Sequence, residues 1–485
     1  LHLGAIERRT IYALILAVLL TIALVTQNVG DGKIARAATN PLKFKTVKLK
    51  GADGGTEPRI ATGRWNWRWV ATNEAGSGEM IIYKSKDGVT WTRTKVDPAG
   101  QEIATIDVDI VRTHTKRSIA SELDFEGINF RTSYSDDGGK TWTESQGATL
   151  GDTDRQWLAA GREDPETHEL PVYLMFHNLV SGTGNHNMYV QTSHDGGETF
   201  GEPVPITLPG TEEYNDLQCS DSGGPSSLMV NKTTGQIYAV WGTRHSAVGG
   251  CGAQPPEVNV VGATRVWVAT SMDGSLGSWT TSLAVDRSDS GHVVGMQLSP
   301  GALDNKGNVY VAFPESPNPY PNYDGASINY TWAPADLSKW SKPVTVAPQG
   351  GPGNVLAHIV VGAPGKIDLA WFKGASQGKG KKPAWYATIA QTLNGLSASP
   401  TIKRKKVSPV PTYTGTASEL MGACGDPGGG FTCNRSTDVW GIDLDLKCRL
   451  MITWPTVANE APGAAAGTYV TTQTGGPTVC KSRQI

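Results

Sequence analysis

Residues 135–142 read SDDGGKTW, a short stretch with a Ser, two Asp, two Gly, a Thr and a Trp. The same pattern returns as SKDGVTW at 85–91, SHDGGETF at 193–200 and SMDGSLGSW at 271–279. Each copy follows a short run in which apolar and polar side chains alternate, as they do in a half-buried strand. An element that recurs in this way is expected to build the fold rather than to form one active site.

The chemistry of the stretch favours a structural turn. Gly139 can supply the positive φ of a tight bend, and the side chains of Ser135 and Asp137 can accept hydrogen bonds from nearby backbone amides. Trp142 begins the next strand, where its ring is expected to pack into the seam of the sheet. The alternative is calcium bound by Asp136 and Asp137, but the longer ligand series of a calcium loop is missing. The corresponding residues of the other copies are Ser85, Asp87 and Trp91; Ser193, Asp195, Gly197 and Phe200; and Ser271, Asp273 and Trp279.

Strand-like segments recur in groups of four around these turns, which predicts four-stranded meanders. The third strand of each group can be recognised seven times: MIIYKSKDG, INFRTSYSDDGG, NMYVQTSHDGG, RVWVATSMDG, SINYTWAPADL, AWYATIAQTL and GTYVTTQTG. A period of about 50 to 80 residues suits propeller blades with insertions. The sequence therefore predicts an all-β, seven-bladed β-propeller, with six blades as the alternative. The ring is expected to close between the tail near Cys480 and the first strand near Phe44 to Leu49.

Composition agrees with this fold class. The 485 residues include 58 Gly, 29 Pro and 15 Trp, and only 18% are charged, which is unlike a helical bundle. The formal net charge of −2 provides no overall basic field, so a nucleic-acid partner is not expected.

The first residues resemble an export signal. Arg8 and Arg9 precede an apolar run from Ile11 to Val25, and small residues follow near Ala37. The run is shorter than the roughly 20 residues of a spanning helix, so cleavage before Ala38 is favoured over a retained anchor. We expect a signal peptide at 1–37, a lead-in segment at 38–55 and the propeller at 56–485, in a secreted or cell-envelope protein that touches a membrane only if the signal is retained.

An even number of cysteines in an exported chain predicts disulfides. Pairing by proximity joins Cys219 with Cys251, Cys424 with Cys433, and Cys448 with Cys480, although six cysteines allow other connectivities. No C-x-x-C pair occurs, so a zinc site is not expected.

At the repeated turns the chain resembles the Asp-box, or bacterial neuraminidase repeat, whose pattern is Ser/Thr-x-Asp-x-Gly-x-Thr-Trp/Phe. Two copies match fully and two differ by one residue in length, which implies a sialidase-like propeller. Sialidase activity is not implied, because the family carries these boxes on the face away from its active centre.

The resemblance also implies where a catalytic site would lie. Family sialidases bind a carboxylate with three arginines and use an Asp acid/base and a Tyr–Glu pair. Arg59, in EPRIA, matches the first arginine except that Ala61 replaces a proline. The remaining candidates are weaker: Glu57, Asp154, Arg155, Arg244, Arg435, and Tyr413 with Glu315.

Polar residues recur just before the predicted inner strands: Glu57, Asp107, Asp154 with Arg155, Asp221, His292, Asn354 and Asp438. They are interpreted first as caps of strand ends around the channel. The alternatives are a carbohydrate pocket, an acidic metal site, or acid/base chemistry by one carboxylate. His177, His245 and His358 lack paired ligand spacing, and Trp65, Trp67 and Trp69 are predicted to lie in a strand buried on one face.

Three classes of function follow. The first is a monomeric, secreted propeller that recognises a glycan or an extracellular protein without a cofactor. The second is an exo-acting glycosidase with sialosides as the leading substrates, and a structural module of the cell envelope is a third alternative.

Overall fold

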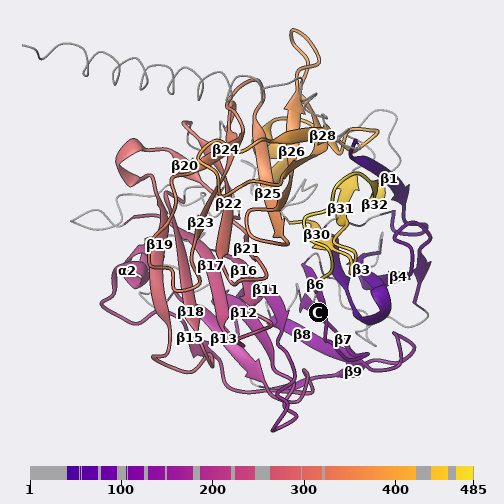
Figure 1. Ribbon diagram of the computed structural model, residues 1–485, viewed down its shortest axis with the longest axis vertical. Helices are drawn as coiled ribbons and strands as arrows, with labels where there is room; N and C mark the ends of the chain where they lie inside the picture. The colour runs from indigo at the N-terminus through magenta and orange to yellow at the C-terminus, as the bar shows by residue number, and fades with distance from the viewer. Residues whose placement is uncertain are drawn as a thin grey trace, which may run out of the picture. The chain divides into compact units, whose positions relative to one another are not determined.

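The computed structural model of the chain describes residues 41–53, 55, 57–74, 78–94, 105, 107–124, 129–147, 150–178, 186–219, 224–245, 263–295, 298–318, 323–421, 439–456 and 466–483. Residues 43–474 and 478–485 belong to one compact unit, which holds the propeller. Seven antiparallel sheets form its blades, and Figure 1 shows β6, β11, β16, β21, β25 and β30 gathered around the centre. The predicted all-β propeller of seven blades is confirmed, and the six-bladed alternative is wrong.

The first four blades follow the chain in order. Blade one contains β2 (Arg59–Thr62), β3 (Arg68–Asn73), β4 (Met80–Ser85) and β5 (Thr92–Arg93). Blade two contains β6 (Val108–Arg112), β7 (Ser118–Asp124), β8 (Asn129–Ser135) and β9 (Thr143–Glu144). Blade three contains β11 (Thr153–Ala160), β12 (Val172–Asn178), β13 (Met188–Ser193) and β15 (Val204–Pro205). Blade four contains β16 (Pro225–Val230), β17 (Ile237–Thr243), β18 (Arg265–Ser271) and β19 (Thr280–Asp286).

Blades five and six each carry one extra strand. Blade five contains β20 (Val293–Val294), β21 (Gly301–Leu303), β22 (Val309–Ser316), β23 (Ser327–Ala333) and β24 (Val344–Ala347). Blade six contains β25 (Asn354–Val361), β26 (Ile367–Ala375), β27 (Ala384–Thr392), β28 (Lys403–Lys406) and β29 (Tyr413–Thr414). The remaining short elements are β10 (Gln146–Gly147), which pairs with β14 (Thr199–Phe200), and η1 (Arg64–Asn66), α2 (Glu212–Gln218), η2 (Ser288–Ser290) and α3 (Ala417–Met421).

The seventh blade joins the two ends of the propeller. Its order is β30 (Gly441–Leu444), β31 (Leu450–Thr456), β32 (Gly467–Gly475) and then β1 (Lys43–Lys48), so the first strand of the chain completes the last sheet. This confirms the predicted closure, and it places part of the expected lead-in segment in a blade. Closing the ring in this way pairs a strand edge that would otherwise stay open.

The core lies between neighbouring blades, because both faces of most sheets are covered. In β17 every residue of the sequence IYAVWGT is buried, as expected for a strand that is covered on both sides. One apolar cluster, for example, joins Ile119 of blade two to Leu158, Val172 and Phe200 of blade three. No helix among the described residues is long and apolar enough to span a membrane.

The cysteine pairing is settled in part. Cys448 and Cys480 form a disulfide, as predicted, and tie the seventh blade to the C-terminal segment. Cys219 is disulfide-bonded as well, but its predicted partner Cys251 lies outside the described residues. Cys424, Cys433 and the predicted signal peptide at 1–37 also lie outside the described residues.

The prediction that Trp65, Trp67 and Trp69 lie in one strand is wrong for the first two. The strand β3 begins only at Arg68, and Trp65 lies in η1, the turn between β2 and β3. Trp65 and Asn66 adopt positive φ values of 56° and 63°, which no strand allows. Trp65 is 57% exposed, whereas Trp69 is buried as expected.

Candidate functional site

The blade topology gives the propeller two distinct faces. The inner strands begin at one face, which we call the entry face, and end at the other. The turns between first and second strands and the repeated turns between third and fourth strands share that second face, which we call the turn face, because every blade is an antiparallel meander. A functional site at the entry side must therefore be built by inner strands of several blades.

Four inner strands contribute to a polar and aromatic group around the centre, which we call the axial cluster: Arg59, Asp109, Trp157, His358 and Trp440. The Arg59 guanidinium is the hub of this cluster. Its Nε donates to Asp109 Oδ1 at 3.1 Å, its Nη1 donates to the Trp440 carbonyl at 3.4 Å, and its Cζ lies 4.5 Å from the centre of the Trp157 ring. The side chain is 24% exposed, and Nη2 makes no hydrogen bond to any described residue.

Neighbouring blades hold the hub in place. Asp109 Oδ2 accepts a hydrogen bond from the Leu158 amide at 2.8 Å, and Trp157 Nε1 donates to the Pro225 carbonyl at 2.6 Å. A register shift between Asp154 and Trp157 in β11 marks a bulge, a feature that turns side chains out of the regular alternation. The Arg59 charge is thus fixed by contacts from blades two and three.

His358 lies on the far side of the cluster, next to Trp440. Its ring meets the Trp440 ring edge-on with 5.1 Å between centroids, and its Nε2 is buried without a hydrogen-bond partner among the described residues. Burial, and to a smaller extent the Arg59 charge, lower the pKa of His358 well below its usual value. The imidazole is therefore neutral, and Nε2 or Nδ1 keeps a lone pair.

A second group extends the site within blade three. His177 Nε2 lies 3.8 Å from Asp154 Oδ2, and His177 Nδ1 lies 3.0 Å from His186 Nε2. His186 Nδ1 lies 3.1 Å from the Leu217 carbonyl, which can only accept, so His186 Nδ1 carries a hydrogen. If His186 is neutral, its Nε2 accepts from His177 Nδ1, and this leaves His177 Nε2 directed at the carboxylate of Asp154. His177 therefore lies between the carboxylate of Asp154 and the ring of His186.

Asp154 stays ionised in this environment. Burial raises the pKa of Asp154, but the neighbouring His177 and the Arg155 charge lower it, and the pKa falls to about 2. Arg155 has a positive φ of 57° in the β11 bulge, so the strand is locally strained at this position. Asp107 lies beside Asp154, and its carbonyl accepts from Gln156 Nε2 at 2.9 Å.

The other predicted site residues are not part of the axial cluster. His292 contacts Glu315 at 2.9 Å in blade five, where Arg287 also binds this carboxylate at 2.8 Å. No described contact joins Glu315 to Tyr413, which is buried in β29, so the structure does not bring the suggested nucleophile pair together. Glu57 is buried, Arg244 is exposed, Asn354 binds the Trp371 indole, and Asp221, Arg435 and Asp438 lie outside the described residues.

On the turn face, the repeated turns use their carboxylates locally. Asp137 accepts hydrogen bonds from Ser135, from the Lys140 amide and from both the amide and the hydroxyl of Thr141 at 2.7–3.0 Å. These donors hold the pKa of Asp137 below its usual range. Equivalent bonds engage Asp87, Asp195 and Asp273. The contacts support the structural interpretation over calcium, and the described residues contain no group of three His, Cys, Asp or Glu side chains suited to a metal.

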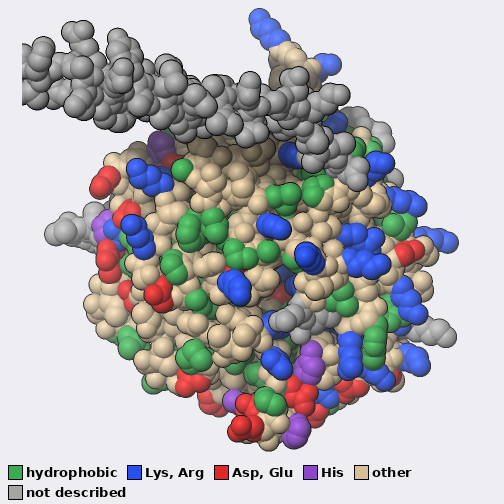
Figure 2. Space-filling model, viewed as in Figure 1, with side chains coloured by type: hydrophobic (Ala, Val, Ile, Leu, Met, Phe, Trp, Pro, Cys, Tyr) green, Lys and Arg blue, Asp and Glu red, His purple; other side chains and the backbone are tan. Residues whose placement is uncertain are grey.

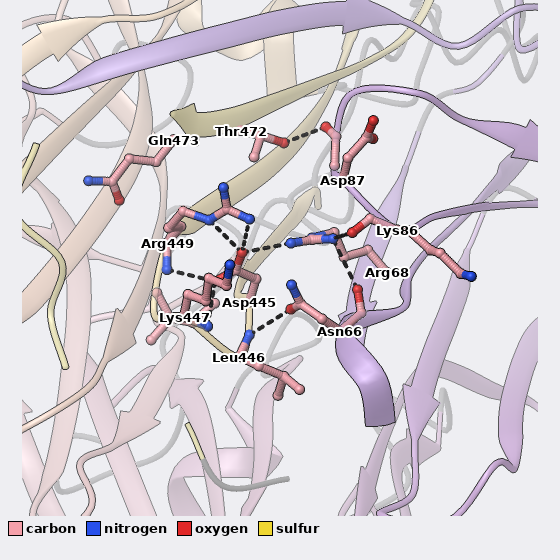
Figure 3. Close-up of polar contacts among 12 residues, drawn as sticks. Asn66, Arg68, Lys86, Asp87, Asp445, Leu446, Lys447, Arg449, Thr472 and Gln473 are labelled. Atoms are coloured by element: carbon pink, nitrogen blue, oxygen red, sulfur yellow. Dashed lines mark hydrogen bonds and ion pairs between the residues drawn. The ribbon is translucent and has the colours of Figure 1, made fainter. Parts of the chain in front are cut away.

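The turns also join neighbouring blades. Lys84 of blade one donates to the Gly138 carbonyl at 2.7 Å, and Trp142 packs against the apolar cluster around Trp69. In the seam between blades seven and one, Arg68 and Asp445 form a buried ion pair at 2.7 Å, which Figure 3 shows with Arg449 on the other side of the carboxylate. The repeated turns and this seam therefore contribute to the stability of the ring.

Sequence analysis named Arg59 and Asp154, but it missed Asp109 and Trp157 and gave His358 no role. A usable signal exists in the chain. In four of the inner strands, counting back four residues from the position just after the strand, at Gly63, Thr113, Gly161 and Gly362, gives Arg59, Asp109, Trp157 and His358. The same position in consecutive blades faces the axis, so aligning the blades on their strand ends would have found the cluster.

Comparisons with known proteins bear on the fold. No protein-family model matches the chain, and no curated protein matches it in sequence. An ulvan lyase of polysaccharide lyase family PL25, bound to -[GlcA(1-4)Rha3S]-, has a similar structure, with a TM-score of 0.50, 12% identity, and coverage of 88% of this chain and 95% of the lyase. The α-L-arabinofuranosidase Arb93A from Fusarium graminearum gives a TM-score of 0.43 at 11% identity, covering 90% of this chain and 97% of its own. An α-L-arabinanase of Penicillium chrysogenum gives 0.42 at 10% identity, covering 90% and 97%. The similarity to the lyase supports the propeller fold.

Proposed function

We propose that the chain is an exported propeller that recognises a glycan with an acidic sugar, and that Arg59 binds the acid group. The observation that carries this proposal is the state of Arg59. Its Nε is bound by Asp109 and its guanidinium plane is supported by the Trp157 ring, while Nη2 of this partly exposed side chain has no partner among the described residues.

Guanidinium chemistry favours a carboxylated ligand. Arginine presents N–H groups in a planar fork that matches the two oxygens of a carboxylate, and a fixed guanidinium loses little entropy when it binds. The second oxygen of Asp109 accepts from the Leu158 amide, so Asp109 binds Arg59 through one oxygen only and does not occupy the whole fork. A neutral sugar would gain far less binding free energy from the Arg59 charge.

Two further points support a glycan ligand. The ulvan lyase with a similar fold is bound to a saccharide that contains glucuronate, so a ring of this architecture is compatible with an acidic sugar. The repeated turns of this chain resemble those of sialidases, whose substrates also carry a carboxylate. Export agrees with the Cys448–Cys480 disulfide.

Hydrolysis by an exo-acting glycosidase is the second candidate. Asp154 is ionised, and the His177–His186 pair next to it could hold a proton, which together provide a base and an acid. Sialosides are the leading substrates in this case. Asp154→Asn should then abolish release of free sugar while leaving ligand binding within about threefold of wild type.

The test is binding by titration calorimetry of the purified chain from Ala38. Glucuronate- and sialate-terminated oligosaccharides are compared with the corresponding neutral sugars. We expect Arg59→Ala to weaken binding of the acidic sugars by about tenfold or more, because a charge-assisted hydrogen bond is lost. Arg244→Ala is the matched control, because that arginine is exposed and outside the axial cluster.

Two results would overturn the proposal. One is equal affinity for acidic and neutral sugars in the wild type. The other is unchanged affinity in an Arg59→Ala protein whose thermal midpoint shows that it is folded.

A further inference from the structure

The turn face of blade one carries an exposed aromatic and basic surface. We call it the tryptophan platform and define it by Arg64, Trp65, Trp67, Lys86 and Lys116. Trp65 is the most exposed tryptophan described, at 57%, and Arg64, Lys86 and Lys116 are exposed as well. The platform thus places one exposed ring and the half-buried ring of Trp67 beside three exposed cations.

The cations are arranged around the rings. Arg64 Cζ lies 4.8 Å and Lys116 Nζ 5.8 Å from the centre of the Trp65 ring. Lys86 Nζ lies 4.8 Å from the centre of the Trp67 ring. These cation–π distances keep the positive charges beside the aromatic faces at the protein surface.

The turn that presents Trp65 is strained and braced. Trp65 and Asn66 both have positive φ, at 56° and 63°, which costs free energy in residues other than glycine. Asn66 is held from two sides, because its Oδ1 accepts from the Leu446 amide at 2.9 Å and its carbonyl accepts from Arg68 at 3.0 Å (Figure 3). The exposed Trp65 ring adds nothing to the core, so the strain indicates a role for the ring outside the fold.

The local charge is strongly positive. The nearby carboxylates of Asp87 and Asp137 are engaged by their own turns, whereas Lys84 and Lys140 add to the basic side chains. Figure 2 shows Lys and Arg side chains gathered over the side of the molecule where β3 and β4 lie. The platform therefore combines an apolar ring face with several cations, which complements a ligand that is flat, partly apolar and anionic.

We infer that the tryptophan platform binds an anionic polysaccharide, as a site separate from the axial cluster. Trp65 would stack on the C–H face of a sugar ring, while Arg64, Lys116 and Lys86 pair with carboxylate or sulfate groups. Arg59 is the first residue of β2, and Trp65 lies in η1, which follows the other end of this strand, so the two sites are on opposite faces of blade one. Such a site would keep the protein bound to a polysaccharide while the axial cluster binds the end of the polysaccharide. A nucleic acid is disfavoured, since one exposed ring and an overall charge of −2 suit a few charged sugars better than a long phosphate backbone.

Affinity electrophoresis of the full chain in gels containing polygalacturonate, dextran sulfate or neutral dextran tests this inference. We expect retardation by the two anionic polymers, weakened by salt, and none by dextran. Trp65→Gly should weaken retardation about fivefold or more and leave the thermal midpoint at or above that of wild type, because glycine adopts positive φ without strain. Arg64→Ala combined with Lys116→Ala should weaken it to a similar extent.

Met272→Ala is the matched control, since Met272 is 61% exposed in another turn of the same face. It should leave retardation unchanged, and Trp65→Gly should leave the calorimetric binding of short acidic oligosaccharides unchanged, which separates this site from the proposed function. The inference is wrong if folded Trp65→Gly protein is retarded like wild type, if dextran retards as strongly as the anionic polymers, or if oligo-dT binds more tightly than either polysaccharide.

Discussion

The two faces of the propeller use their charged groups in opposite ways. On the turn face, Asp137 and Asp445 each accept several hydrogen bonds from residues close in sequence or in the next blade. Around the axis, Arg59 and His358 keep polar atoms that no described residue engages. Satisfied groups stabilise a fold, whereas buried or half-buried groups without partners cost stability and are retained where a ligand meets them. The difference indicates that the carboxylates of the repeated turns and of the seam hold the ring together, whereas the axial cluster recognises a ligand.

Removing the buried charge at Asp445 should have the largest effect. Arg68 and Asp445 are both completely buried, and Asp445→Asn would leave the Arg68 guanidinium without its counter-charge. We expect the free energy of unfolding to fall by about 3–5 kcal/mol, measured by urea denaturation. Arg449→Met removes the other, partly exposed partner of the same carboxylate and should cost less than half as much.

Equal losses in Asp445→Asn and Arg449→Met would contradict the account of the seam. In that case burial of the Arg68 charge would not be the cause of the loss in the free energy of unfolding of Asp445→Asn. The binding of acidic sugars should be unchanged in both variants at temperatures where they are folded.

Two neighbouring glycines allow a finer comparison within one turn. Gly138 and Gly139 both have positive φ, at 81° and 77°, but a methyl group at Gly139 would meet Thr94 at 2.8 Å and Trp69 at 3.1 Å. At Gly138 it would meet only Lys84 Nζ at 3.7 Å. Thermal unfolding should therefore show a loss of about 1 kcal/mol for Gly138→Ala and about 2–3 kcal/mol for Gly139→Ala. A smaller loss for Gly139→Ala would mean that the turn does not pack tightly against blade one.

Much of the fold was predictable because its signals are local. The pattern of SDDGGKTW fixes a turn through its own side chains and backbone amides, and the strand before it alternates in the usual way. The turn pattern occurs four times and its strand seven times, which indicates a ring of seven blades, and Cys448 and Cys480 lie near enough in sequence to suggest their pairing. Each of these inferences needs only residues that are neighbours along the chain.

The axial cluster was harder to predict because its contacts join separate blades. Nothing near Arg59 in the sequence indicates that Asp109 binds it or that Trp157 lies beneath it. The prediction that Trp65 lies in a strand was wrong for another reason. Its alternation of aromatic and polar residues resembles a strand, whereas bonds from Leu446 and Arg68 to Asn66 hold a left-handed bend that local propensity disfavours.

The smallest expected effect concerns His358 and is the most direct probe of the axial cluster. The pKa of His358 is low because the ring is buried and, secondarily, because Arg59 is nearby. As the pH falls below about 6.5, unfolded chains take up a proton at this histidine and folded chains do not, so this group makes the fold less stable in acid. Arg59→Met removes the nearby positive charge and should raise the pKa of His358, but only in part, because burial is the larger cause.

The free energy of unfolding of Arg59→Met should then decline less between pH 7 and pH 5 than that of wild type, and NMR titration of the His358 ring should move to higher pH. An unchanged titration would show that Arg59 and His358 do not share one electrostatic site, whereas Arg244→Met should leave it unchanged in either case.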